Sequence, residues 1–139
     1  MRIFLDKEII TEIIEKYYQE QFDIIGKVNI TADKQFGSYG FSDIEESLIK
    51  IELIGNINLL GKKQKTKITI TTDEMLKAIK YYIEQEGYVY KGYELDKGLH
   101  EETIGYGLSE ETKKNPYFNG VQINVDTKNK TKEMKKNEY

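Results

Sequence analysis

Few side chains in this sequence have the type and spacing for metal or acid–base chemistry. The single histidine, His100, is followed by Glu101 and Glu102 and preceded by Asp96. Imidazole and carboxylate groups bind metals, but one histidine cannot build the usual multi-histidine zinc site. Adjacent residues of a loop also seldom point the same way. We therefore interpret this segment as a polar surface loop and expect no metal site.

Nucleophilic catalysis is equally poorly supported. Ser42 and Ser109 each lie two residues after a Tyr-Gly pair and directly before an acidic residue. A serine nucleophile needs an adjacent general base, and the single histidine cannot serve both positions. A turn or capping role suits both serines better. Carboxylates are plentiful, but no spacing selects a catalytic pair, and no phosphate-cradling or dinucleotide motif is present. We expect a non-enzymatic protein without a cofactor.

Lysines are concentrated in two short segments that could contact phosphates. They include Lys62, Lys63, Lys65 and Lys67 near the middle, and Lys128, Lys130 and Lys132 near the end. Lysine–phosphate contacts give sequence-independent, salt-sensitive binding to nucleic acid. The net charge is −3 although these two segments are positive, so the rest of the chain is strongly acidic. The acidic part would repel nucleic acid unless the lysine-rich segments project far from it. We interpret the segments as a solvated loop and tail, with nucleic-acid binding as the alternative.

Tyrosine is the most conspicuous residue type, with 11 copies and no tryptophan. Its ring offers a broad apolar face with a polar tip, and it is enriched in interface hot spots. The other interpretation, tyrosines at the rim of a small core, stays open. The candidates for a partner-binding surface are Tyr88, Tyr90, Tyr93, Tyr106 and Tyr117.

Length and composition limit the class of protein. The 139 residues suffice for one domain, and 38% hydrophobic with 32% charged residues is a soluble balance. No apolar run approaches the ~18 residues that span a bilayer, and the first residues lack a signal-peptide core. The absence of cysteine excludes disulfides and the common structural zinc sites. Richness in Ile, Lys, Asn and Tyr indicates a low-GC bacterium or its phage, and we expect a cytoplasmic protein of a bacterial host cell.

Two segments show the periodicity of amphipathic helices. The first begins at Asp6, a favoured N-cap type, and the second at Thr71, where Glu74 completes a capping box. Gly87 supplies a stop for the second helix. The apolar stripe of the first helix consists of Ile9, Ile10, Ile13, Ile14 and Tyr17, and that of the second of Met75, Leu76, Ile79 and Ile83.

The remaining pattern is strand-like. Residues 49–59 alternate apolar and polar side chains like a half-buried antiparallel strand, and residues 67–71 form a short strand before the second helix. Gly55 interrupts the apolar face, which indicates a bulge or the close approach of another backbone. Residues 121–125 repeat the alternation after two turn-like pairs, Asn-Pro and Asn-Gly, within residues 115–120.

The two halves of the sequence match in order. At an offset of about 66 residues the helix segments superimpose and Gly26 falls on Gly92, as an internal repeat requires. Further on, the Tyr-Gly pair at 39–40 matches the pair at 106–107, and Asn56–Leu59 matches Gln122–Val125. The two lysine-rich stretches match last. This order predicts a tandem duplication, although chance similarity between two αβ patterns is the alternative.

We therefore predict an α+β fold in which two tandem helix-plus-antiparallel-strand repeats share one sheet and pack both helices on one face. The repeats span about residues 7–67 and 73–127 of a single domain, residues 1–127. A unit of about 60 residues buries only about 60% of its unfolded surface, so two units gain by sharing a core. Residues 128–139 are predicted to be a lysine-rich tail.

Three function classes remain. The first is a non-enzymatic protein that binds another protein with a basic surface, a phage or mobile-element inhibitor of a host defence system, with anti-CRISPR proteins as an example of the type. The second is a nucleic-acid-binding accessory protein that uses the two lysine-rich segments. The third is a small-ligand sensor or enzyme with a cleft between the repeats, lined by Tyr39, Tyr106, Asn58 and Asn124. No membrane partner is expected, and the oligomeric state is open.

Overall fold

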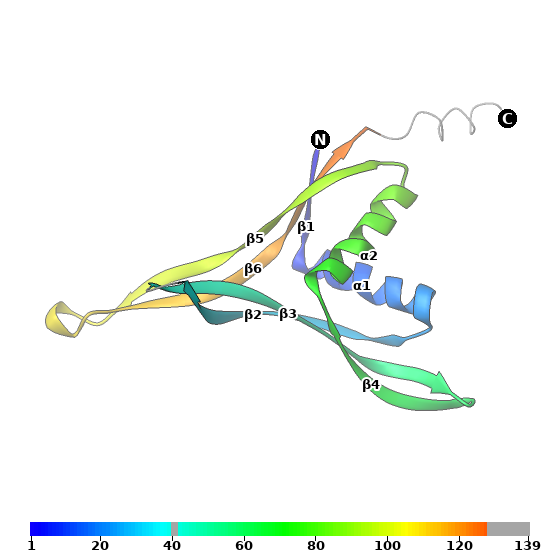
Figure 1. Ribbon diagram of the computed structural model, residues 1–139, viewed down its shortest axis with the longest axis horizontal. Coiled ribbons are helices and arrows are strands. Elements are labelled where there is room, and N and C mark those ends of the chain that lie inside the picture. Colours follow the sequence, from blue (N-terminus) through cyan, green and yellow to red (C-terminus); the bar gives the residue numbers. More distant parts are fainter. Residues whose placement is uncertain (40–41, 128–139) are drawn as a thin grey trace.

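The computed structural model describes residues 1–39 and 42–127, without the side chains of residues 35–39, 42–46 and 109. The described residues form six strands and two α-helices, and each helix directly follows a strand (Figure 1). The elements are β1 (Arg2–Asp6), α1 (Lys7–Phe22), β2 (Ile25–Tyr39), β3 (Ser42–Leu59), β4 (Lys62–Ile70), α2 (Thr72–Gln85), β5 (Val89–Ile104), the 3-10 turn η1 (Gly107–Ser109) and β6 (Glu111–Asp126). The predicted α+β class is confirmed.

Both helices begin at the predicted residues because their caps are encoded locally. The Asp6 side chain accepts a hydrogen bond from the backbone N–H of Ile9 at 2.8 Å. At the second helix, Thr71 and Glu74 form the reciprocal capping box. Gly87 has a φ of +91°, a left-handed conformation that glycine adopts without strain, and it ends α2.

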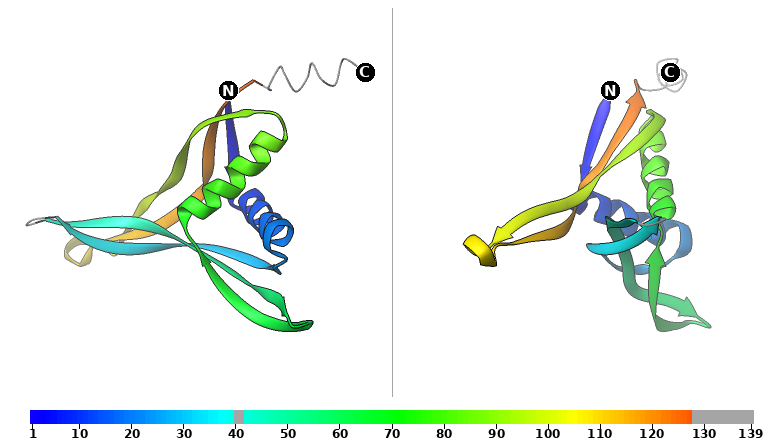
Figure 2. Two further views of the ribbon diagram at one scale, coloured as in Figure 1. Left: turned by 45° about the vertical axis from the view of Figure 1, so that its right-hand side comes forward. Right: turned by 60° about the vertical axis from the view of Figure 1, so that its left-hand side comes forward.

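The strands form two sheets, so the prediction of one shared sheet is wrong. One sheet has the order β2-β3-β4 and the other β1-β6-β5, and all pairs are antiparallel. The middle strands β3 and β6 are each paired on both sides, so neither has a free edge that could pair with a strand of the other sheet. Instead, β1 pairs with β6, the last strand of the described residues, and the two sheets enclose an angle in which both helices lie (Figure 1 and Figure 2).

The element order β-α-β-β occurs twice, and the two sheets follow the same pairing scheme. Each consists of the hairpin of one half plus the leading strand of the other half, β4 or β1. Matching rows of apolar residues cross the two sheets: Ile30, Ile51 and Ile70 in one, and Leu95, Val121 and Leu5 in the other. This register makes Gln122 the counterpart of Glu52, whereas the sequence alignment matched Gln122 with Asn56. The repeated topology supports the duplication hypothesis, which stays a prediction.

One hydrophobic core joins both halves. It collects the facing side of each sheet and the apolar stripes of the helices, except for Ile9, which was predicted to belong to the first stripe but is 41% exposed. Its most deeply buried side chains are Ile10, Ile14, Ile30, Ile51, Leu53, Met75, Ile79, Val121 and Ile123. The close approach predicted at Gly55 is present: a Cβ atom there would lie 2.3 Å from the carbonyl oxygen of Ile25, directly beside Gly26 on β2.

Three local predictions are wrong. The segment from Asp96 to Glu102, predicted to be a polar surface loop, is part of β5 and pairs with β6. The lysine-rich stretch 62–67 is not a loop but the first part of β4, which continues the pairing with β3 beyond the core. The Asn-Pro and Asn-Gly pairs within residues 115–120 are not turns but lie inside β6. Pro116 is tolerated there because β1 pairs only with Gly120–Asn124, so β6 has one open edge at the proline.

Candidate functional site

The hairpin of β5 and β6 extends well beyond its sheet. β1 accompanies β6 only along Gly120–Asn124, whereas the pairing of β5 with β6 continues to Ile104 and Glu111. In Figure 1 this hairpin ends at the far left, away from both helices. At its end Tyr106 is 93% exposed, Leu108 is fully exposed, and Ile104 is half exposed. The hairpin thus carries large apolar side chains on a tip that no core covers.

Acidic side chains surround this tip. Glu101, Glu102, Glu110 and Glu111 are all exposed. Lys113 and Lys114 lie opposite Glu102 and Glu101 across the strands and offset two of the four negative charges. The tip, which we define as residues 101–114, is therefore apolar at its end and acidic around it.

The base of the hairpin is braced against β3. The Lys97 ammonium donates to the backbone carbonyl of Ser47 at 2.9 Å, and the Ser47 hydroxyl donates to the carbonyl of Tyr117 at 3.2 Å. The Tyr117 ring covers Gly98, where a Cβ atom would lie 2.9 Å from the phenol oxygen, and stacks on His100 with 4.2 Å between ring centroids. An aromatic ring over a strand glycine compensates for the missing side chain. These contacts therefore hold the part of the hairpin below the tip against β3.

The predicted partner-binding tyrosines do not form one surface. Tyr88 and Tyr90 pack partly against the core, and Lys80 lies 5.8 Å from the Tyr90 ring centroid. Burial raises the pKa of Tyr90. Tyr93 follows on the same strand and is about half exposed. Tyr106 and Tyr117 belong to the hairpin, and of the five only Tyr106 stands at a projecting tip.

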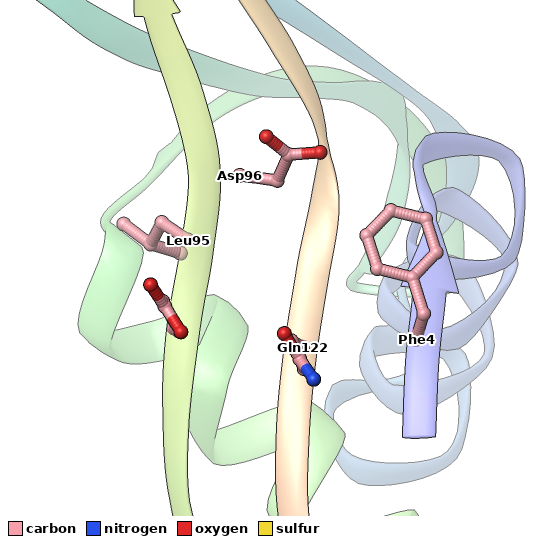
Figure 3. Close-up of a pocket in the computed structure, with 5 residues that line it drawn as sticks. Phe4, Leu95, Asp96 and Gln122 are labelled. Atoms are coloured by element: carbon pink, nitrogen blue, oxygen red, sulfur yellow. The ribbon is translucent and has the colours of Figure 1, made fainter. Parts of the chain in front are cut away.

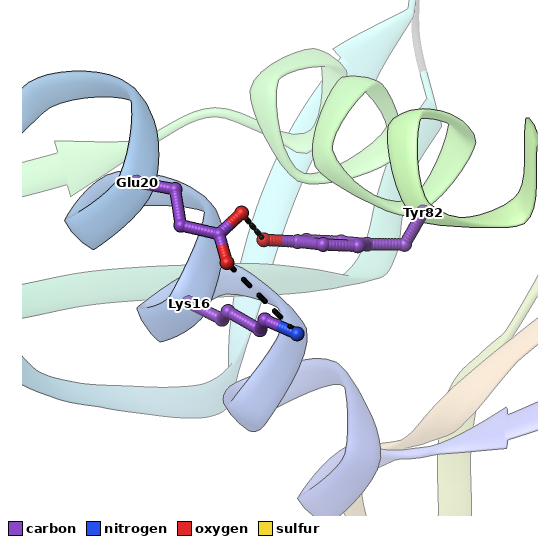
Figure 4. Close-up of polar contacts among 3 residues, drawn as sticks. All are labelled: Lys16, Glu20 and Tyr82. Atoms are coloured by element: carbon purple, nitrogen blue, oxygen red, sulfur yellow. Dashed lines mark hydrogen bonds and ion pairs between the residues drawn. The ribbon is translucent and has the colours of Figure 1, made fainter. Parts of the chain in front are cut away.

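Sequence reasoning missed a second aromatic cluster, which joins the helices. Tyr17 of α1 meets Tyr81 of α2 edge-on at 5.5 Å between centroids, and Tyr18, Phe22 and Tyr82 extend the contact. The Tyr82 hydroxyl donates to Glu20 at 2.9 Å, and Lys16 pairs with the same carboxylate (Figure 4). The signal was a Tyr-Tyr pair near the end of each helix.

A partly buried hydrogen bond strengthens this helix contact. The Tyr18 hydroxyl donates to Glu74 at 3.0 Å, and burial together with this bond raises the pKa of Tyr18 to about 12. The backbone N–H of Thr71 holds the pKa of Glu74 below its ordinary value, and the bonds from the hydroxyls of Thr71 and Tyr18 act in the same direction. These tyrosines therefore support the packing of the two helices.

The middle lysine segment is distributed over two faces of β4. Lys63, Lys65 and Lys67 point away from the core, whereas Lys62 follows the alternation of the core-facing residues. Lys128, Lys130 and Lys132 lie outside the described residues. The structure therefore places only the middle segment.

The predicted chemical side chains are not gathered into a site. Among residues 1–39 and 42–127, no group of three or more carboxylate or imidazole side chains is placed to hold a metal ion. The Ser42 and Ser109 side chains lie outside the described ones, as does that of Tyr39. Asn58 donates to Asp23 at 3.4 Å, and Asn124 is exposed on the middle strand β6, between Arg2 of β1 and Gly92 of β5. These residues do not line a common cleft in the described part of the chain.

A shallow hollow lies on the outer face of the second sheet (Figure 3). Phe4 supplies an apolar ring and Glu94, Asp96 and Gln122 the polar part, while Leu95, whose side chain packs against the core, borders the hollow. The Phe4 ring lies against Gly120, where a Cβ atom would be 2.9 Å from the ring. Asp96 accepts a bond from Asn119 at 3.3 Å. No convergent pair of acid and base is formed here.

Comparison with known proteins gives no relative: no family model, no curated sequence and no solved structure matches this chain. Neither of the described helices is long and apolar enough to cross a membrane. We therefore infer the function from the exposed side chains and the charges of the surface.

Proposed function

We propose that this is a non-enzymatic protein that binds another protein through the tip of the β5–β6 hairpin. The observation that carries the proposal is the exposure of Tyr106, which is 93% accessible, together with that of Leu108. The partner surface that fits this tip is an apolar pocket with a basic rim.

Tyr106 and Leu108 are large side chains whose surface stays exposed to solvent in the free protein. Fully burying a large apolar side chain is worth about 1.5–3 kcal/mol, and Tyr106 and Leu108 forgo most of this gain in the free protein. A partner pocket that closes over them recovers it. The hairpin base is held by Ser47 and Tyr117, so less conformational freedom is lost on binding than with a flexible loop.

The charges support a basic partner. Four glutamates ring the tip against two lysines, and the whole chain carries −3. Such a distribution attracts a positively charged surface over a Debye length of about 10 Å at 0.1 M salt and raises the association rate. Proteins that handle nucleic acids carry basic surfaces of this kind.

Within this proposal, the narrower function is inhibition of a host defence protein. The small size, the low-GC composition and the acidic binding tip support a protein of phage or mobile-element origin that acts in the bacterial cytoplasm. Occupying a basic nucleic-acid-binding groove would require only a shape-matched acidic surface and no catalysis.

Site-specific photo-crosslinking tests the proposal. A benzoylphenylalanine at position 106 is expected to capture one discrete protein in host cells, identified by mass spectrometry. The matched control carries the same group at position 60, which is exposed at the tip of the β3–β4 hairpin. The purified captured protein should then bind the unmodified chain. A set of products identical at positions 106 and 60, or a captured protein that does not bind, contradicts the proposal.

A further inference from the structure

The outward face of the first sheet is basic. The strand register places three lysines of β4 on this face beside one lysine from each of the other two strands. They are Lys27, Lys50, Lys63, Lys65 and Lys67. Glu52 lies among them and pairs with Lys50 at 3.3 Å and Lys67 at 3.4 Å. Among the described side chains, Asp33 also lies on this face, and Asp23 accepts a hydrogen bond from Asn58 beside Lys63. Three carboxylates therefore face five lysines, and positive charge remains in excess.

Within the described part of the chain, Lys27, Lys63 and Lys65 make no ion pair. Side chains two residues apart on a strand point the same way, so Lys63, Lys65 and Lys67 form a row with about 6.7 Å between successive positions. Charges at this spacing along a straight line are suited to a polyanion with regularly spaced phosphates.

The ribbon of β3 and β4 ends in a turn that sequence preferences disfavour. Leu60 and Gly61 are its central residues, with φ values of +53° and +74°, as in a type I′ turn. Asparagine is the usual residue at the first position, because a leucine resists the left-handed conformation. Leu60 is also 94% exposed and Leu59 more than half exposed. A strained, exposed leucine contributes nothing to the fold and indicates contact with a partner.

The position of this ribbon removes the electrostatic objection to a polyanionic partner. The β3–β4 hairpin leaves the molecule on the side away from the acidic tip of β5 and β6, as Figure 1 and both views of Figure 2 show. The two regions of opposite charge are therefore separated by the body of the molecule.

We propose that the β3–β4 ribbon is a second interface, which binds duplex DNA with Leu60 in a groove and the lysine face along the phosphates. A two-stranded ribbon fits the major groove of B-form DNA, about 12 Å wide, whereas the major groove of duplex RNA is too deep and narrow. In the major groove an apolar side chain at the tip can contact the methyl group of thymine. This interface is independent of the protein-binding tip proposed above.

A membrane surface suits the lysine row less well. Lys67 lies about 20 Å from the turn, at about 3.3 Å per residue. A planar membrane touched by Leu60 would leave that lysine beyond the Debye length of about 10 Å. A groove keeps phosphates close along the whole ribbon.

The test measures binding of the full chain to a fluorescent mixed-sequence DNA duplex of about 20 base pairs by anisotropy, over a range of salt concentrations. Three to five phosphate contacts predict a slope of log K against log salt of about −2.7 to −4.5. The triple variant Lys63→Gln, Lys65→Gln, Lys67→Gln should weaken binding about tenfold or more at about 50 mM salt and flatten the slope by two to three.

Two matched triple variants remove the same charge elsewhere. Lys7→Gln, Lys77→Gln, Lys80→Gln changes exposed helix positions, and Lys128→Gln, Lys130→Gln, Lys132→Gln changes the C-terminal segment. Both should bind the duplex within about twofold of the unmodified chain. If either weakens binding as much as the β4 triple variant, net charge or the C-terminal segment is responsible and the proposal fails.

The turn has its own variant, chosen so that folding and binding change in opposite directions. Leu60→Asn suits the left-handed conformation, so the melting temperature should stay equal or rise, while DNA affinity falls several-fold. Unchanged affinity overturns the role of Leu60. No binding of the duplex, tighter binding of duplex RNA, or tighter binding of phosphatidylserine vesicles overturns the assignment to DNA.

Discussion

At the scale of single residues, the protein uses its tyrosines in two different ways. Tyr18 and Tyr82 are fixed between the helices by bonds to Glu74 and Glu20. Tyr106 stands exposed at a hairpin tip. Tyrosine suits both environments because it combines an apolar ring with one polar atom. Residue type alone therefore did not distinguish support of the fold from recognition of a partner.

The burial of Tyr18, together with its bond to Glu74, makes stability depend on alkaline pH. The pKa of Tyr18 is raised to about 12, above its value of about 10 in an unfolded chain. The corresponding stability is fully present below pH 10 and is lost as the pH rises towards 12. Urea unfolding should show a smaller alkaline loss of unfolding free energy for Tyr18→Phe than for the unmodified chain. Tyr106→Phe, at the exposed tip, is the control and should behave like the unmodified chain.

Substitution of Ser47 tests whether this residue holds the β5–β6 hairpin against β3. Ser47 is the buried polar side chain of the described core, and its hydroxyl donates to the carbonyl of Tyr117. Ser47→Ala should cost about 1 kcal/mol of unfolding free energy, because a part-buried carbonyl loses its donor. Amide hydrogen exchange in residues 97–117 should accelerate relative to the helices. Exchange that is unchanged there would show that the bond does not hold the hairpin.

At the scale of elements, the helix starts could be predicted from the local sequence, whereas the pairing of the strands could not. The helix caps at Asp6 and Thr71 are encoded within four residues and are confirmed. The partner of β1 is β6, at the other end of the chain, and no local pattern specifies such a choice. Strand 62–67 was missed because it lies beyond the core and has polar residues on both faces, so it lacks apolar alternation.

The predicted close approach at Gly55 gives a test of the first sheet. Gly55→Ala would place a Cβ atom 2.3 Å from the backbone carbonyl of Ile25, and both strands would have to separate. We expect a loss of about 2 kcal/mol or more of unfolding free energy. Gly92→Ala is the matched control, because nothing lies within 4 Å of its Cβ position. Equal losses for the two variants would contradict the described strand contact.

At the scale of the whole molecule, two hairpins of opposite charge leave a shared core in different directions (Figure 1). The sequence indicated an acidic body with basic segments, but only the fold shows where they lie. The five candidate tyrosines divide between the core rim and the hairpin, and the basic face includes Lys27 and Lys50, which lie far from the lysine cluster in sequence. Such convergence depends on strand register, which one sequence does not specify.

The central claim is that the β5–β6 tip binds a protein, and affinity for the captured partner tests it most directly. The Tyr106→Ser, Leu108→Ser variant should bind at least about 30-fold more weakly by calorimetry, equivalent to about 2 kcal/mol, with its melting temperature unchanged. The control Leu59→Ser, Leu60→Ser removes two exposed leucines from the other hairpin tip and should bind the partner as the unmodified chain does. Full affinity of the Tyr106, Leu108 variant, or an equal loss in the control, would contradict the claim.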